Sequence, residues 1–472
     1  MKGVRTAAGL LLLLGLLGCG SPERAPESYG NGNGNGSVSA AEAVQDSVLV
    51  EVGNLPFKKR RWDHRFTDWS IKRFSLGREY LYIETPDNKV VAIDRFEGLT
   101  KWVFDVPTHR APDHTPTEAL EVYDQVRTYE EALRAQERVI QDLLKTEGAG
   151  PKSLEAQREK NRLSQLLNAA QRGDNVYLLS RQVLYCIARQ TGKWLWSKDL
   201  PFAPSAKPFA TRESIYVPAA DHSQVWRLDV EHRGDSIQKF AANVGSGDRT
   251  ILNQPIVDSP QLFFVSADGN CYAYDINTGD QKWTFKAHDK LAADPTLHKV
   301  RETVRDSTGR ESVRTRRYLF CGGLDYALYC IDPNDGSLTW KYETGGFLRT
   351  PIIVKDRTVY VKSDDGALFA LELDPQHRNA RTGANEGTRR GGLRRWKLPL
   401  GERFVVKGSE ERVLVLGPAS ELYQVNDRNG EITGRYPMVE LRHVLSNPWD
   451  SILYVATDWG HIFALEESGS QY

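Results

Sequence analysis

One short pattern, repeated eight times, limits what this chain can fold into more than any other feature. The pattern is an apolar residue, an aromatic residue or valine, a variable and often small residue, a second apolar residue, and then usually an acidic or amide residue. Its copies are residues 90–94, 184–188, 225–229, 271–275, 328–332, 368–372, 422–426 and 462–466. Several copies are nearly continuous apolar runs, which are typical of a strand buried on both faces.

Each copy belongs to a larger unit of strands and tight turns. An Asp-Gly pair stands before several copies, as at residues 268–269 and 365–366, and this is a hairpin signal between apolar runs. The shortest spacing between copies is about 40 residues, the length of a four-stranded propeller blade. The sequence therefore predicts an all-β fold, an eight-bladed β-propeller of four-stranded antiparallel blades.

Most copies are followed by a second turn and a strand that carries tryptophan. We expect these tryptophans, with one more near the N-terminus, to dock neighbouring blades on one another. They are Trp62, Trp102, Trp194, Trp283, Trp340 and Trp396.

The two ends of the repeat region complement each other. The eighth copy ends near Tyr472 without a following tryptophan strand, whereas residues 59–66 form an isolated strand that contains Trp62. We expect this N-terminal strand to complete the last blade, because the pairing joins the ring and removes an exposed edge.

A stretch of about 60 residues interrupts the repeat and predicts a helical hairpin, residues 114–172, between the first and second blades. Gly150 and Pro151 separate its two helices. The helical spacing is carried by Ala119, Val122, Val126, Tyr129, Leu133, Gln136, Ile140 and Leu143, and then by Leu163, Leu166, Leu167 and Ala170. The hairpin either packs on itself and the propeller, which we favour, or serves as a docking arm. Smaller insertions are a charged hairpin at residues 300–316 and a basic loop at residues 377–395.

The N-terminus has the pattern of an export signal. Lys2 and Arg5 precede an apolar run, residues 7–17, which is too short to span a bilayer. Gly18-Cys19 then resembles a bacterial lipobox, which implies a signal peptide of residues 1–18 and a lipidated Cys19. An ordinary signal peptide with a chance cysteine is the alternative. Residues 19–46 are rich in Gly, Asn, Pro and Ser and predict a flexible tether, so that residues 47–472 form the propeller.

The full blade motif resembles that of the quinoprotein (PQQ-like) propellers. The closest copies are residues 264–283, 319–340 and 359–372, and the resemblance covers residues 58–472 apart from the insertions. That family includes PQQ-dependent dehydrogenases and the lipoprotein propeller of the outer-membrane β-barrel assembly machinery. The lipobox, the compact size and the isolated N-terminal strand favour the second kind. A WD40 array is disfavoured because the two Trp-Asp pairs, at residues 62–63 and 449–450, are not periodic.

The sequence offers no catalytic, cofactor-binding or metal-binding motif. The dehydrogenases of this family hold PQQ against a disulfide between adjacent cysteines and bind Ca²⁺ with Glu, Asn and Asp, but no two cysteines are adjacent here. We interpret Cys186, Cys271, Cys321 and Cys330 as small buried residues, with Cys321 and Cys330 as the pair to consider for a disulfide. There is no H-E-x-x-H, G-x-S-x-G or Walker motif.

These observations lead to one functional expectation and two alternatives. The formal net charge is zero, which argues against a nucleic-acid partner. We expect a monomeric, non-catalytic propeller, anchored through Cys19, that binds envelope or outer-membrane proteins. By resemblance, it would lie at the outer membrane, face the periplasm and act in outer-membrane protein assembly. The alternatives are a PQQ-dependent dehydrogenase and a ligand-sensing propeller.

Overall fold

The structure is a computed structural model of the whole chain, and it describes residues 40–57, 59–66, 70–107, 112–146, 148–220, 224–240, 250–305, 311–373, 392–408 and 411–467. The chain divides into two compact units, residues 1–45 and 46–472. The second unit contains the repeats and all of the strands described here. The helices are α1 (Ala40–Asn54), α2 (Leu120–Thr146), α3 (Pro151–Arg172) and a short 3-10 helix (Pro418–Ser420).

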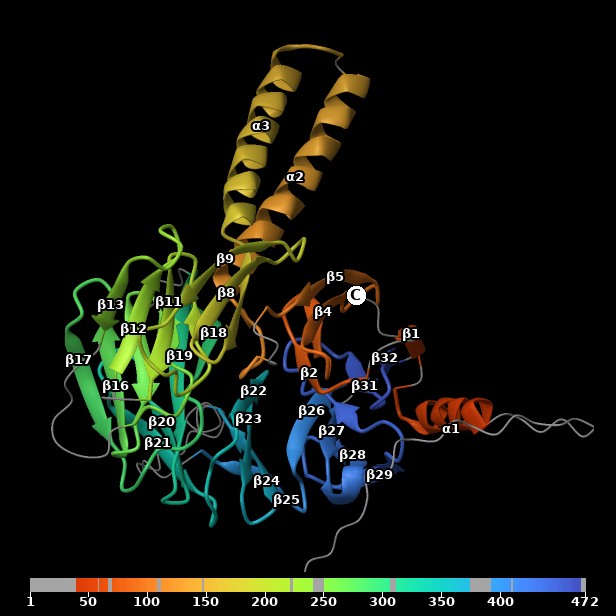
Figure 1. The fold of residues 1–472 in the computed structure, drawn as a ribbon, viewed down its shortest axis with the longest axis vertical. Helices are drawn as coiled ribbons and strands as arrows, with labels where there is room; N and C mark the ends of the chain where they lie inside the picture. Colours follow the sequence, from red (N-terminus) through yellow and green to blue (C-terminus); the bar gives the residue numbers. More distant parts are fainter. Residues whose placement is uncertain are drawn as a thin grey trace, which may run out of the picture. The chain divides into compact units, whose positions relative to one another are not determined.

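The strands form eight four-stranded antiparallel sheets, the blades of a propeller (Figure 1), as the sequence predicted. Blade 1 contains β2 (Arg73–Leu76), β3 (Tyr80–Glu84), β4 (Lys89–Asp94) and β5 (Thr100–Asp105), and blade 2 contains β6 (Thr117–Glu118), β7 (Asn175–Ser180), β8 (Val183–Ala188) and β9 (Trp194–Asp199). Blade 3 contains β10 (Phe209–Ala210), β11 (Ser214–Ala219), β12 (Gln224–Asp229) and β13 (Ile237–Phe240), and blade 4 contains β14 (Ile256–Asp258), β15 (Gln261–Val265), β16 (Asn270–Asp275) and β17 (Gln281–Lys286). Blade 5 contains β18 (Thr296–Arg305), β19 (Glu311–Gly322), β20 (Ala327–Ile331) and β21 (Leu338–Glu343), and blade 6 contains β22 (Ile353–Lys355), β23 (Thr358–Ser363), β24 (Ala367–Glu372) and β25 (Arg394–Pro399). Blade 7 contains β26 (Arg403–Lys407), β27 (Arg412–Leu416), β28 (Glu421–Asn426) and β29 (Ile432–Pro437), and blade 8 contains β30 (His443–Val444), β31 (Leu453–Ala456), β32 (His461–Glu466) and β1 (Lys59–Arg65).

The last blade is closed by the N-terminal strand, as expected. β1 pairs antiparallel with β32, from Lys59 opposite Glu466 to Arg65 opposite His461. The Lys59 ammonium group also lies 2.8 Å from the Glu466 carboxylate, at the start of that pairing. The first and last strands of the folded body therefore share one sheet, which satisfies an edge that would otherwise be open.

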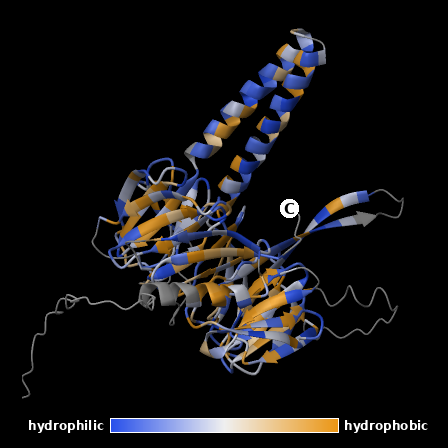
Figure 2. Cartoon of the chain, turned by 90° about the vertical axis from the view of Figure 1, so that its right-hand side faces the viewer, coloured by the Kyte–Doolittle hydropathy of each residue, from blue (hydrophilic) through white to orange (hydrophobic). Residues whose placement is uncertain are grey.

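The core lies between the blades. The second strands β3, β7, β11 and β15 are buried along their whole length, because one set of side chains packs on the preceding blade and the other on the next. One such cluster joins Tyr82 and Trp102 of blade 1 to Tyr185 and Ile187 of blade 2. Figure 2 shows the blade strands as mainly hydrophobic segments. The repeated pentapeptides lie on the third strands, which are buried in the same way in β4, β16, β20 and β32, and this explains why they are nearly continuous apolar runs.

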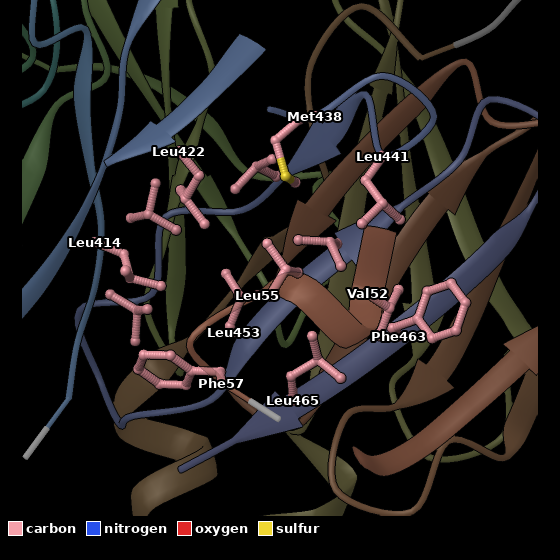
Figure 3. Close-up of a cluster of buried hydrophobic side chains, with 14 of the residues drawn as sticks. Val52, Leu55, Phe57, Leu414, Leu422, Met438, Leu441, Leu453, Phe463 and Leu465 are labelled. Atoms are coloured by element: carbon pink, nitrogen blue, oxygen red, sulfur yellow. The ribbon is translucent and has the colours of Figure 1, made fainter. Parts of the chain in front are cut away.

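The sequence interpretation missed the helix α1 that precedes β1. Its residues Val48 and Val52, followed by Leu55 and Phe57, are buried in a cluster with Leu414, Leu422, Met438, Leu441, Leu453, Phe463 and Leu465, mostly from blades 7 and 8 (Figure 3). The Glu51 carboxylate accepts the backbone N–H groups of Glu440 and Leu441, at 2.9 and 3.2 Å. The segment before the closing strand is thus part of the folded body, and α1 overlaps the last residues of the expected tether.

The two described insertions, the helical hairpin and the charged hairpin, share one face of the propeller. Neighbouring strands are antiparallel, so in every blade the connection between the first and second strands and the one between the third and fourth leave the same end of the sheet. The helical hairpin lies between β6 and β7, the charged hairpin is formed by β18 and β19, and residues 374–391 connect β24 to β25. We call this side the insertion face. The helical hairpin thus interrupts blade 2 after its first strand instead of joining blades 1 and 2, and most of the expected basic loop lies outside the described residues.

The cysteines are buried, as the sequence predicted, but Cys321 and Cys330, the pair to consider for a disulfide, do not face each other. Cys321 and Cys330 are on neighbouring strands, but Cys321 packs with blade 4 and Cys330 packs with blade 6. Their side chains therefore point to opposite faces of blade 5, and the two are not a disulfide pair. Cys321 instead contacts Cys271 of blade 4, and this contact and burial raise the pKa of the Cys271 thiol. All four are buried, and none forms a disulfide among the described residues.

Candidate functional site

Five of the six expected tryptophans lie at junctions between blades. Each indole N–H donates to a main-chain carbonyl in the turn after the third strand of the next blade, at 2.6 to 3.1 Å. The pairs are Trp62 with Arg95, Trp102 with Arg189, Trp283 with Pro333, Trp340 with Leu373 and Trp396 with Asp427. A buried tryptophan needs such an acceptor, and here the next blade supplies it.

The expectation for Trp194 was wrong, because this residue does not occupy the docking position. It is 49% exposed and lies opposite Ile187, whereas Trp196 lies opposite Cys186. In blade 1 the docking tryptophan, Trp102, lies opposite Ala92, which matches Cys186 in the repeat. In both blades a bulge shifts the strand register just after this small residue, at Ala92 in blade 1 and at Cys186 in blade 2. The residue of blade 2 that is equivalent to Trp102 is therefore Trp196, which is half-buried beside Tyr177. The spacing would have revealed it: each docking tryptophan that follows a turn glycine comes four residues after it.

The helical hairpin is attached to the blades at its base. Val122, Tyr123 and Val126 of α2 are buried, and Ala170 at the end of α3 joins the same cluster as the blade 2 strands. From blade 3, the backbone N–H of Arg212 donates to the Glu121 carboxylate at 2.7 Å. The base of the hairpin is therefore held by blades 2 and 3 together.

A buried ion cluster supports this attachment. The Arg189 side chain is 1% exposed, and its Nε and Nη2 atoms each lie 2.6 Å from the Asp174 carboxylate. Its third nitrogen donates to Glu79 of blade 1. The guanidinium also lies over the rings of Tyr80 and Tyr123, at 5.3 and 5.0 Å. Burial opposes the charge, but Asp174 and Glu79 raise the pKa of Arg189, so the guanidinium stays charged.

A groove opens beside this cluster on the insertion face. It has a volume of about 320 Å³ and lies between α2 and the turns of blades 1 and 2. Its walls carry both charge signs together with aromatic and apolar surface, and they consist of Glu79, Phe96, Tyr123, Val126, Arg127, Glu130, Glu131, Arg134, Arg189 and Gln190. Within it, Arg127 and Glu131 form an exposed ion pair of 2.9 Å along α2. Such a lining suits a peptide segment with mixed polar and apolar side chains.

Two arginines and a tryptophan extend the charged surface toward blade 8. The guanidinium groups of Arg78 and Arg95 lie 5.3 and 5.5 Å from the Trp449 ring. Arg95 also forms a 2.7 Å ion pair with Asp450, and Arg78 lies 3.6 Å from Asp124 of α2. Blades 8 and 1 and the hairpin therefore meet in one polar network, so the groove has walls in fixed positions.

A second hollow, of about 430 Å³, lies between blades 6, 7 and 8. Tyr360, Leu368 and Phe404 give it a mainly apolar wall, with Lys362 and Arg403 among the polar groups. The Tyr360 hydroxyl donates to Asp427, and burial raises the pKa of this phenol. We take the hairpin groove as the candidate site, because ionic groups of blade 1, blade 2 and the helical hairpin converge on it, among them the buried Arg189.

The residues present do not match a PQQ site of the dehydrogenase kind. The four described cysteines lie in blades 2, 4 and 5, buried in the packing between blades, and no two are adjacent in sequence. Within the described parts of the chain, no group of three or more His, Cys, Asp and Glu side chains is arranged to hold a metal ion. The described residues therefore do not form a site of that kind for PQQ or Ca²⁺.

Cys19, the expected lipid anchor, lies outside the described residues, as do the signal peptide and most of the tether. No helix in the described ranges is long and apolar enough to cross a membrane.

Comparisons with known proteins agree with this architecture. The family described as outer membrane protein assembly factor BamB matches residues 141–236 and 299–444, just over half of the chain. The crystal structure of BamB from Moraxella catarrhalis is similar with a TM-score of 0.53 and 12% identity, over 88% of this chain and 99% of that one. The computationally designed Ika8 protein is similar with a TM-score of 0.51 and 11% identity, over 86% of this chain and 98% of that one. No curated protein matches the sequence.

The structural likeness at these identities establishes the fold, and the sequence match establishes the relationship. The eight blades, the strand that joins the two ends of the ring and the repeated blade motif are consistent with both. This chain belongs to the BamB family of PQQ-like propellers.

Proposed function

We propose that this protein is a non-catalytic scaffold of the cell envelope, anchored by a lipid on Cys19, that holds protein partners during outer-membrane protein assembly. Family membership supports the context, and the lipobox supports the anchor. On this proposal the chain is attached to the outer membrane and faces the periplasm.

The observation that carries the proposal is the groove at the base of the hairpin. Arg189 joins blade 1, blade 2 and the hairpin through Glu79, Asp174 and Tyr123, so the walls of the groove are held before any partner arrives. Preorganised walls reduce the ordering cost of binding. Charges of both signs on those walls favour a protein segment of matching pattern over a uniformly charged polymer.

Exchange of one ion pair tests the groove. The double variant Arg127→Glu with Glu131→Arg keeps the net charge and the helix but inverts the pattern that a partner meets. The matched control is Glu159→Arg with Arg162→Glu, an exposed pair on α3. Each protein, without its signal and with Cys19 replaced, is immobilised and exposed to detergent-solubilised envelopes of the source bacterium. We expect the groove variant to lose most of the β-barrel assembly proteins that the parent and the control retain.

The cellular role and the anchor are tested separately. Deletion of the gene should lower the amount of outer-membrane β-barrel proteins measured by mass spectrometry, and the groove variant should not restore it. Cys19→Ala should abolish incorporation of radioactive palmitate. Unchanged β-barrel levels in the deletion strain would contradict the assembly role, and turnover of an alcohol or sugar with added PQQ and Ca²⁺ would contradict the non-catalytic one.

A further inference from the structure

We propose that the outer parts of β18 and β19 bind an extended acidic segment of a partner protein, which adds to β19 as a further strand. This part of the two strands, residues 299–305 and 311–317, is called the ribbon below. The proposal rests on the proposed scaffold function and assigns it a second contact on the insertion face, three blades away from the hairpin.

The ribbon has a strand edge that its own blade does not cover. β18 and β19 pair over ten residues, from Thr296 opposite Phe320 to Arg305 opposite Glu311. β20 pairs with β19 only from Leu319 to Gly322. The stretch around Val313 therefore has β18 on one side and no strand on the other within the described residues. In an antiparallel strand, alternate residues direct their N–H and C=O groups to each side, so this edge can accept another strand.

The base and the outer part of the ribbon differ in charge. At the base, Lys299 and Arg317 both pair with Asp258 of blade 4, at 2.5 and 2.9 Å. Glu302 pairs with Arg357 of blade 6 at 3.3 Å. These contacts with blades 4 and 6 fix the direction in which the ribbon leaves its own blade.

Farther out, cations exceed carboxylates. The exposed residues Arg301, Arg314 and Arg316 are accompanied by two carboxylates, those of Glu311 and of Glu302, which lies opposite Arg314 and is already paired with Arg357. Opposite charges across a strand pair stabilise it and like charges destabilise it, so an acidic strand fits this edge and a basic one does not. The excess of positive charge also attracts an acidic segment over several ångströms before contact.

The register specifies the pattern that the partner needs. Arg314 and Arg316 are two residues apart and lie on one face of β19, whereas Val313 and Thr315 lie on the other. Val313 is 71% exposed. An incoming strand would therefore place two acidic side chains, two residues apart, beside the arginines. The residue between them would lie beside Thr315, and the next residue beyond the one beside Arg314 would cover Val313 and would be apolar.

A lipid surface fits the ribbon less well. The cations occupy both faces, because Arg301 pairs with Thr315 and lies on the same side as Val313, opposite to Arg314 and Arg316. A segment that lies on a membrane separates an apolar face from a cationic one. A purely protective role for the charges is the remaining alternative, since charged residues on an edge strand also prevent unwanted pairing.

The test uses a labelled seven-residue peptide in which glutamate alternates with valine. Binding is measured by fluorescence anisotropy, and hydrogen exchange of the β19 amides by mass spectrometry. We expect the peptide to bind and to slow hydrogen exchange around Val313. Binding should be about tenfold weaker for the double variant Arg314→Glu with Arg316→Glu. A peptide with lysine in place of glutamate should not bind. The control, Arg138→Glu with Arg158→Glu on the exposed helices, should bind like the parent.

Peptides with N-methyl groups on alternate residues separate strand addition from simple attraction, because they keep the charge but lose backbone donors on one edge. Equal binding of N-methylated and ordinary peptides, no change in exchange, or no binding at all would overturn the proposal. The proposal would also be overturned if Arg314→Glu with Arg316→Glu abolished binding to phosphatidylglycerol vesicles but left binding of the peptide unchanged. If this variant still captures the β-barrel assembly proteins, the ribbon is excluded and the scaffold function stands.

Discussion

The indole N–H of Trp62 donates to the carbonyl oxygen of Arg95 at 3.0 Å. Trp62 belongs to the strand that closes blade 8, and Arg95 belongs to the turn after the third strand of blade 1. The contact therefore joins the last blade to the first with the same geometry that Trp102 uses between blades 1 and 2. Closure of the ring depends on the same chemistry as its other junctions.

Removal of this contact should destabilise the whole propeller. We expect Trp62→Ala to lower the free energy of unfolding by about 3–5 kcal/mol, because the side chain is 9% exposed and its loss leaves a cavity and an unused acceptor. Trp194→Ala, at a 49% exposed tryptophan, should cost less than about 1 kcal/mol. Urea unfolding followed by far-UV circular dichroism measures both. Equal losses in the two variants would show that the junction is not a source of stability.

Gly98, the turn glycine against which the Trp62 ring packs, provides a second test of the junction between blades 8 and 1. Gly98 has a φ of +74°, and a Cβ atom there would lie 2.6 Å from the Trp62 ring. Gly279 has a φ of +77°, but a Cβ atom there would have no neighbour within 4 Å. We expect Gly279→Ala to cost about 1–2 kcal/mol from backbone strain alone. Gly98→Ala should cost about 1–3 kcal/mol more, because the indole must also move. Chemical denaturation of the two variants side by side would contradict this account if their midpoints agreed.

The buried arginine of the hairpin base should matter for stability and for the groove. We expect Arg189→Met to cost about 3–5 kcal/mol, because it leaves the Asp174 carboxylate buried without its partner. The double variant with Asp174→Leu should recover part of this loss, since no charge then remains unpaired. Hydrogen exchange should become faster in the first turns of α2 in the single variant. Arg162→Met, on the exposed surface of α3, is the control and should change the unfolding free energy by less than about 0.5 kcal/mol.

Glu84 should make stability depend on pH near neutrality. Its carboxylate is buried, Oε1 lies 3.1 Å from Arg73, and Oε2 has no hydrogen-bond partner among the described residues. Burial raises the pKa of Glu84 from its ordinary value of 4.5 to about 7, although Arg73 and Lys72 oppose this. Between these values the folded state holds more protons than the unfolded one, so the contribution of Glu84 to stability falls as pH rises from about 4.5 to 7.

We therefore expect Glu84→Gln to be more stable than the parent at pH 8, by up to about 3 kcal/mol, and to lose that advantage at pH 5. Thermal unfolding at both pH values measures the difference. The control Glu159→Gln, on the exposed part of α3, should show no such reversal. A parent protein whose stability increases between pH 5 and 8 while the Glu84→Gln variant does not would reverse the sign that we assign to this group.

Much of the fold was predictable because the blade is a local unit. The repeated strand, the turns beside it and the tryptophan strand all lie within about 40 residues, so alternation and turn residues identify each blade without its neighbours. The isolated strand with Trp62 was assigned correctly by elimination, since one blade lacked a strand and one strand lacked a blade. The helical hairpin was also visible, but β6 before it has only two residues and carries no alternation, so its place inside blade 2 was not.

The candidate site was much less predictable. Trp194 was chosen over Trp196 because both belong to one tryptophan-rich strand, and only the bulge opposite Cys186 decides which of them lies at the repeated position. The buried pair of Asp174 and Arg189 lies just before β7 and just after β8 of one blade, but its third partner, Glu79, is 110 residues from Arg189. Helix α1 has the apolar residues Val48 and Val52 at helical spacing, but the sequence before it is polar and rich in Gly and Asn, which favours a flexible tether.

The sequence by itself determined the number of blades, their strand composition and the closure of the ring, because hydrophobic alternation and turn chemistry are properties of short segments. Only the tertiary structure decided which carbonyl each tryptophan reaches, which face of blade 5 each cysteine occupies and how blades 1 and 2 and the hairpin form a groove. Those relations depend on register and on contacts between residues far apart in the chain, and no local pattern encodes the distance between them.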